Sequence, residues 1–88
     1  MSATLEVACI QQACGDDRIA NLNRSAALVH EAAAGGARLV LLQELHAGPY
    51  FCQVEDVACF DRAEPIPGPS SDFLAALARE AGVVLVAS

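Results

Sequence analysis

The chain has 88 residues and a mass of 9.1 kDa, which allows one domain at most and excludes a large self-contained enzyme. Eleven acidic residues against five arginines, with no lysine, give a formal net charge of −6, which argues against nucleic acid or an anionic membrane as a partner. Hydrophobic residues make up 55% of the chain but aromatic residues only 5%, so we expect a core of small aliphatic side chains packed between regular elements.

The first predicted strand covers residues 4–12, where apolar and polar side chains alternate as far as a turn-forming Gly-Asp-Asp sequence. Asp16 or Asp17 can cap a helix over residues 17–35, because an aspartate accepts hydrogen bonds from the free N–H groups of a first helical turn. Gly35 and Gly36 are expected to end this helix. Apolar side chains recur along it at three- and four-residue steps and are expected to face the core: Ile19, Leu22, Ala26, Val29 and Ala33.

A second strand is predicted over residues 38–43, because its apolar run is short, branched and typical of a strand covered on both faces. A long loop over residues 44–69 ends in a segment rich in proline, after which Ser70 or Ser71 can cap a helix over 71–81. Gly82 ends that helix, and a third strand follows over 83–87. This order predicts an α/β fold, β-α-β-α-β, with parallel strands joined by right-handed crossovers.

Two features of this layout bear on function. The loop over residues 44–69 is far longer than the usual strand-to-helix connection of about 2–6 residues, which favours a binding or active-site loop. The last strand is wholly apolar and requires neighbours, so an uncovered Val83–Val86 edge would promote association with a partner or with copies of the chain. A non-catalytic α/β association module is therefore an alternative to an enzyme.

Glu44 follows the second apolar strand with one residue between, which places a carboxylate at the carboxyl end of a parallel strand. Open α/β sheets bind their ligands at that edge. A water-poor position there would raise the proton affinity of the carboxylate, so Glu44 could act as a general base toward a neighbouring nucleophile. The alternative is a solvated acid that marks the end of the strand.

Other polar and aromatic residues of the loop have ordinary structural interpretations as well as functional ones. Tyr50 and Phe51 could line a small-molecule pocket or tether the loop to the core, and we favour the tether for Phe51. His46 and Cys52 are close in sequence, but a nucleophile and its base must meet in space, so no catalytic pair is predicted. His30 is assigned no role. Four acids could attract a cationic substrate or simply form a solvated surface: Glu55, Asp56, Asp61 and Glu64.

The four cysteines, Cys9, Cys14, Cys52 and Cys59, are expected to be reduced, because nothing in the sequence signals secretion. Their spacing fits no familiar zinc pattern, so no metal site is predicted. No apolar run approaches the roughly 20 residues of a membrane span. The N-terminus also lacks the basic and apolar regions of a secretion signal, so we expect a cytoplasmic protein with no membrane partner.

The sequence from Leu41 to Gln53, LLQELHAGPYFCQ, resembles the beginning of a nitrilase-superfamily carbon–nitrogen hydrolase. Within that superfamily the chain is most similar to the N-carbamoylputrescine amidases. The resemblance extends from the first strand, ending in Gln11-Gln12, through the segment AEPIPGP at residues 63–69 to the last strand. It implies a sandwich of two stacked sheets flanked by helices, of which these residues form the beginning of a single domain.

The resemblance also implies a catalytic glutamate, lysine and cysteine, in which the cysteine attacks the carbon of a C–N bond in a small-molecule amide. Only the glutamate carries over, onto Glu44, as the base that takes the thiol proton, and Tyr50 corresponds loosely to a pocket-lining residue. No cofactor is implied, and a homo-oligomer is expected by analogy. Because the chain has no lysine, and no cysteine in the matching motif, we expect it to be the incomplete first portion of an amidase, inactive alone. A relative acting on another linear amide, nitrile or ureido acid is the alternative.

Overall fold

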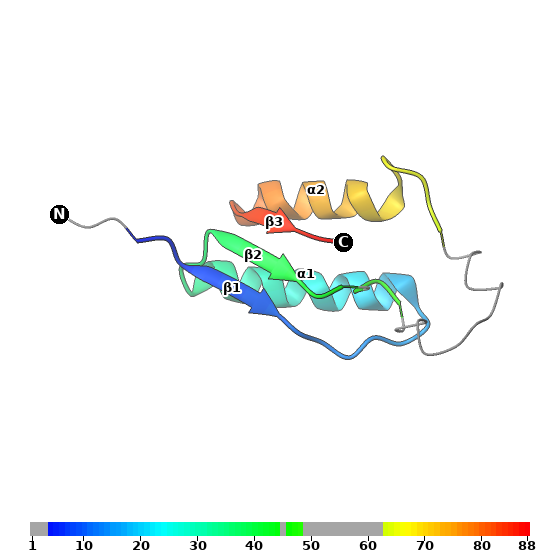
Figure 1. Ribbon diagram of the computed structural model, residues 1–88, viewed down its shortest axis with the longest axis horizontal. Helices are drawn as coiled ribbons and strands as arrows, with labels where there is room; N and C mark the ends of the chain where they lie inside the picture. The colour runs from blue at the N-terminus through cyan, green and yellow to red at the C-terminus, as the bar shows by residue number, and fades with distance from the viewer. Residues whose placement is uncertain (1–3, 45, 49–62) are drawn as a thin grey trace.

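The computed structural model describes residues 4–44, 46–48 and 63–88. Its elements are β1 (Val7–Ile10), α1 (Arg18–Ala34), β2 (Leu39–Leu42), α2 (Pro69–Ala81) and β3 (Val84–Val86). The strands form a parallel sheet in the order β1-β2-β3, with β2 in the centre. The predicted α/β class and the parallel pairing are therefore confirmed (Figure 1).

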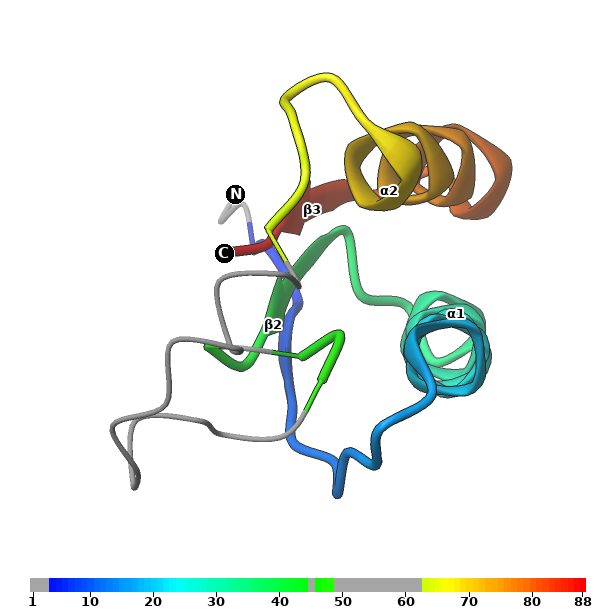
Figure 2. The same cartoon turned by 90° about the vertical axis from the view of Figure 1, so that its right-hand side faces the viewer.

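Both helices cover the same face of the sheet, as the end view in Figure 2 shows. Two crossovers of the same hand that step in the same direction across a sheet place both helices on one side. Among the described residues only the helix-facing side of β2 is fully covered, and cover for its other face stays a prediction. Val40 is fully buried and Leu42 is 9% exposed, whereas Leu39 and Leu41 remain partly exposed on the other face.

The core lies between the sheet and the two helices. Its centre consists of Val40 from β2 and Val29 from α1, both with no exposed surface, and Leu77 of α2 packs beside them. Small and aliphatic side chains complete this cluster, as the composition predicts. The other buried members are Ile10, Ala37, Leu42 and Val83.

Helix α1 begins and ends where the sequence places its signals. The Asp17 carboxylate accepts hydrogen bonds from the N–H groups of Ile19 and Ala20 at 3.0 and 3.2 Å. Gly35 caps the other end, and Gly36 follows with a φ of +106°, which glycine adopts without strain. The predicted burial of Ile19 is wrong, because it lies in the exposed first turn and is 69% exposed.

Helix α2 begins at Pro69, two residues before the predicted start, with Gly68 as its N-cap. Neither Ser70 nor Ser71 is the N-cap. Ser71 instead lies at the third helical position, where its hydroxyl oxygen accepts the Gly68 N–H at 2.7 Å. Gly68 occupies the cap because a Cβ there would lie 2.2 Å from the Pro65 carbonyl oxygen.

The sheet face opposite the helices is apolar and aligned in register. Parallel pairing places Val7, Leu39 and Val84 in one row across the three strands, and Cys9, Leu41 and Val86 in the next. Val7, Val84 and Val86 are 51%, 65% and 48% exposed, respectively. This set of six side chains is called the open sheet face below.

Candidate active site

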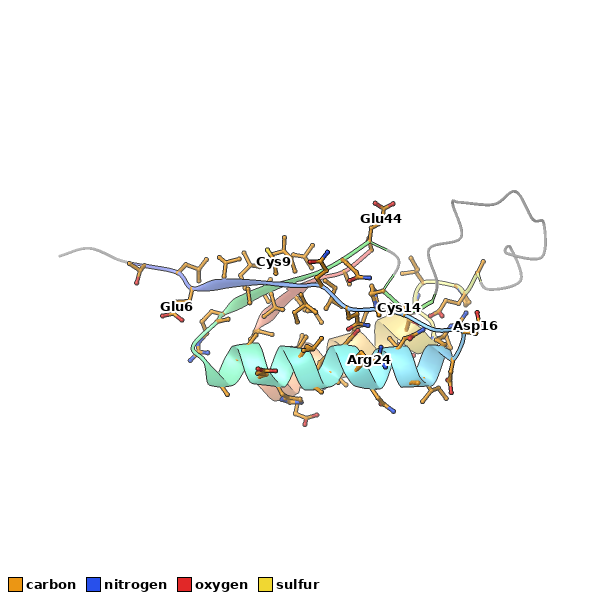
Figure 3. All side chains as sticks on the ribbon, turned by 90° about the horizontal axis from the view of Figure 1, so that it is seen from below. Glu6, Cys9, Cys14, Asp16, Arg24 and Glu44 are labelled. Carbon is orange, nitrogen blue, oxygen red and sulfur yellow. The ribbon has the colours of Figure 1, made fainter. Side chains whose placement is uncertain are left out.

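Glu44 lies two residues beyond the carboxyl end of β2, the central strand of the sheet. Figure 3 shows its side chain pointing away from α1, to the same side as Cys9 of the open sheet face. Glu44 is exposed, so the predicted water-poor position is not supplied by the described residues. The reason is that both helices cover the opposite side of the sheet.

The segment that carries Glu44 is attached to the connection between β1 and α1 by a set of polar side chains. The Gln12 backbone N–H donates to Gln43 Oε1 at 2.6 Å, so a side-chain amide ends the main-chain pairing of β1 with β2. Gln12 Nε2 donates to the carbonyl oxygens of His46 and Asn21, both at 3.3 Å. Cys14 Sγ donates to the same His46 carbonyl oxygen at 3.1 Å.

Two buried polar residues of α1 complete this set. Asn21 is 2% exposed, and its side-chain amide both donates to the Gly15 carbonyl at 2.8 Å and accepts the Gly15 N–H at 3.0 Å. Asn21 Nδ2 also donates to the Ala47 carbonyl at 3.1 Å. Ser25 has no exposed surface and donates to Gln12 Oε1 at 3.2 Å. We call Gln12, Cys14, Asn21 and Ser25 the polar cluster.

The polar cluster was not predicted, because the apolar positions of α1 alone do not indicate it. The signal was nevertheless present, since Asn21 and Ser25 are four residues apart and therefore share one helical face. That face adjoins Leu22 and Val29, which are buried as predicted. Two polar residues flanking an apolar stripe at this spacing indicate a buried hydrogen-bonding set near the start of the helix.

His46 is 4% exposed, and its Nδ1 atom has no hydrogen-bond partner among the described residues. Burial lowers the pKa of His46 below its usual 6.5, because it disfavours the charged imidazolium, and a hydrogen bond with the Ser88 backbone offsets part of this effect. His46 therefore favours the neutral form. Its imidazole is a buried part of the fold, and its carbonyl holds the Glu44 segment to the polar cluster.

Glu64 is the one member of the predicted acidic group that lies in the described residues. Its carboxylate accepts hydrogen bonds from the N–H and hydroxyl of Ser70 at 2.5 and 2.9 Å, and pairs with Arg18 at 2.9 Å. Burial alone would raise the pKa of Glu64, but these hydrogen bonds and the Arg18 charge outweigh it and lower the pKa below 4.5. Glu64 thus has a structural role, because its contacts join the start of α2 to the start of α1.

A cavity of about 470 Å³ lies near the carboxyl end of β3 and the start of α2. Its walls include His46, Glu64, Leu74 and Leu85, and Glu44 does not line it. The cavity and the Glu44 carboxylate are therefore separate features of this edge of the sheet.

The remaining predicted residues divide between the described and the undescribed parts of the chain. Tyr50, Phe51 and Cys52, with Cys59 and the acids Glu55, Asp56 and Asp61, lie outside the described residues. Cys9 and Cys14 are free thiols. His30, which was given no role, contacts Glu80 of α2 at 3.4 Å. Within residues 4–44, 46–48 and 63–88, no group of three or more His, Cys, Asp or Glu could hold a metal ion, and no helix is long and apolar enough to cross a membrane.

Open α/β sheets bind their ligands beyond the carboxyl ends of their strands, and Glu44 lies at that edge of this sheet. The model of the carbon-nitrogen hydrolase family matches residues 6–88. The chain belongs to the carbon–nitrogen hydrolase family.

Individual relatives agree with this assignment. The chain is 43% identical over 83 residues to the N-carbamoylputrescine amidase of Solanum lycopersicum, covering 93% of this chain and 28% of that protein. It is 39% identical over 66 residues to the omega-amidase NIT2-A of Xenopus laevis, covering 75% of this chain and 22% of that protein. A crystal structure of a carbon-nitrogen hydrolase from Helicobacter pylori G27 superposes with a TM-score of 0.87 at 34% identity, covering 96% of this chain and 29% of the other.

Proposed function

We propose that the chain supplies the general-base glutamate of an amidase that hydrolyses N-carbamoylputrescine to putrescine, carbon dioxide and ammonia. The observation that carries the proposal is Glu44, at the carboxyl end of the central strand in a chain of this family. Similarity to N-carbamoylputrescine amidases over 93% of the chain supports the choice of substrate. The activity would place the protein in polyamine biosynthesis, acting in the cytoplasm as a homo-oligomer without a cofactor.

In this mechanism Glu44 accepts the proton of a cysteine thiol, and the thiolate attacks the carbamoyl carbon of the substrate. The attack forms a C–S bond and a tetrahedral oxyanion, whose collapse breaks the bond to one carbamoyl nitrogen, and that nitrogen leaves with the proton that Glu44 had accepted. Water then cleaves the C–S bond and restores the thiol, and the carbamic acid released decomposes into carbon dioxide and the second nitrogen product, so that putrescine and ammonia are both formed. The reaction needs a nucleophile, a base and a group that stabilises the oxyanion, and loss of one such donor alone costs roughly 10²–10³ in rate. Among the described residues, Glu44 is the member of that set that we assign.

The other two groups are proposed to come from polypeptide beyond these 88 residues. The chain spans 28% of the length of the tomato amidase, and it contains no lysine. The open sheet face supports the same proposal, because six apolar side chains in register are the surface on which a second sheet packs, at about 10 Å. A covering sheet would also desolvate Glu44, which points to that side.

The test is ammonia release from N-carbamoylputrescine by the whole protein and its Glu44→Gln variant. Glutamine keeps the size of the side chain but cannot accept the thiol proton, so turnover should fall by at least about 10²-fold. Glu31→Gln, the same change at an exposed position on α1, is the control and should retain activity. Turnover near the unsubstituted rate in Glu44→Gln would remove Glu44 from the mechanism.

A related amidase activity is the second candidate, because the chain is also 39% identical to an omega-amidase over 75% of its length. Both activities use the same base, so Glu44→Gln does not separate them. The two activities are separated by comparing kcat/KM for N-carbamoylputrescine with kcat/KM for linear amides and ureido acids that lack the amine. A preference of tenfold or more for one of these compounds, worth about 1.4 kcal/mol, would favour the second candidate.

A further inference from the structure

Described residues on both sides of Glu44 are anchored by hydrogen bonds. Before Glu44, the Gln43 side chain accepts the Gln12 backbone N–H at 2.6 Å. After it, the His46 carbonyl accepts hydrogen bonds from Gln12 Nε2 at 3.3 Å and Cys14 Sγ at 3.1 Å. The next carbonyl, of Ala47, accepts from Asn21 Nδ2 at 3.1 Å. The chain on both sides of Glu44 is therefore anchored to α1 and to the connection between β1 and α1, and not to β2 alone.

The anchoring side chains are themselves fixed. Asn21 makes two hydrogen bonds to Gly15, one through each end of its amide, which fixes the orientation of the amide group. Gln12 Oε1 accepts the hydroxyl of Ser25, so its Nε2 atom must face the His46 carbonyl. Both Asn21 and Ser25 are almost completely buried, and a hydrogen bond is electrostatically stronger in such surroundings than in water.

Packing alone does not explain why these positions are polar. Asn21 and Ser25 lie beside Leu22 and Ala26 on a helix whose buried face is otherwise apolar. Apolar residues of similar volume would fill the same space without the desolvation cost of burying polar atoms. What apolar residues could not do is fix the position of the Ala47 and His46 carbonyls. We therefore infer that the polar cluster fixes the positions of the residues that flank Glu44.

We propose that Gln12 and Asn21 are positioning residues for the Glu44 carboxylate, acting through the Gln43 side chain and the carbonyl groups of His46 and Ala47. The inference rests on the proposed function, in which Glu44 is the base. A misplacement of about 1 Å at a reacting group can lower a rate by roughly 10²-fold, so a small shift of this segment matters for turnover. Gln12 and Asn21 need not touch the substrate for this effect.

The test compares Gln12→Met and Asn21→Leu in the whole protein, with Gln11→Met and Asn23→Leu as matched controls. Each control makes the same change one or two residues away at an exposed position. We expect the two cluster variants to lower kcat for ammonia release from N-carbamoylputrescine by roughly 10- to 100-fold, with KM changed by less than about threefold. The controls should match the unsubstituted protein.

A double-substitution experiment separates positioning from general damage. In a Glu44→Gln background the base is gone, so Gln12→Met should lower the residual rate by less than about twofold. If Gln12→Met lowers the rate equally in both backgrounds, or matches Gln11→Met, the positioning role is refuted. Ser25→Ala, which removes only one hydroxyl, provides a milder variant if Asn21→Leu fails to fold, with an expected loss of several-fold in kcat. Full activity of Glu44→Gln would instead overturn the proposed function, so the two failures are distinguishable.

Discussion

Glu64 performs the capping role that Gly68, without a side chain, cannot perform for α2. Its carboxylate accepts the N–H and hydroxyl of Ser70, at the second helical position, and pairs with Arg18 of α1. A hydrogen bond to a charged group contributes about 1.5–3 kcal/mol, and a partly exposed ion pair at most about 1 kcal/mol. Because glutamine keeps a side-chain oxygen that accepts hydrogen bonds and loses only the charge, we expect Glu64→Gln to remove part of this contribution and to lower the free energy of unfolding by about 2 kcal/mol.

The pH dependence gives this prediction a second readout. Since the folded protein lowers the pKa of Glu64 below 4.5, the stabilisation is present above pH 4.5 and is lost as the pH falls through the lowered value. Glu64→Gln should remove this loss. The control is Glu80→Gln on the same helix, whose side chain is 71% exposed and should contribute less than about 0.5 kcal/mol. Urea unfolding at pH 7 and at several values below 4.5 measures both effects, and equal stability of the Glu64 and Glu80 variants would refute the capping role.

Three further perturbations follow from the fold. His46 has a lowered pKa, so stability should decline as the pH falls below 6.5, and His46→Phe should abolish that decline in urea titrations between pH 7 and 5. Gly68→Ala places a Cβ 2.2 Å from a backbone oxygen and should cost about 1–3 kcal/mol of unfolding free energy, whereas Gly15→Ala, with open space around it, should change it by less than about 0.5 kcal/mol. The 88-residue chain should self-associate with concentration in sedimentation, and Val84→Lys on the open sheet face should reduce that association; a concentration-independent monomer before substitution would contradict it.

The helices and strands could be predicted from local signals because each signal acts within a few residues. Asp17 caps α1 through its own next turn, and Gly36 ends the helix through its own φ angle. The apolar run from Leu39 to Leu42 likewise predicts a strand from its own residues, and this strand is the central one of the sheet. The start of α2 was misplaced because its cap depends on a carboxylate four residues before Gly68, which no local capping rule includes.

The candidate site was only partly predictable, because its organisation depends on contacts across the chain. Glu44 was found from its position after a strand, but its exposure follows from both helices covering the other face. The polar cluster joins Gln12 to His46 and Asn21 to Ala47, which lie 34 and 26 residues apart. The pattern of residues within a single helix or strand cannot predict contacts between residues so far apart in the sequence.

The open sheet face and the Glu44 carboxylate lie on the same side of the sheet, and this links folding to chemistry (Figure 3). Any polypeptide that covers the two apolar rows removes water from the side of the sheet to which Glu44 points. Removal of water raises the proton affinity of a carboxylate and strengthens its interactions with nearby charges. Contacts made on the open sheet face would therefore also change the surroundings of Glu44. The polar cluster lies toward α1 instead, and Gln12, Cys14 and Asn21 hold the carbonyl groups of His46 and Ala47 through hydrogen bonds that do not involve the open sheet face.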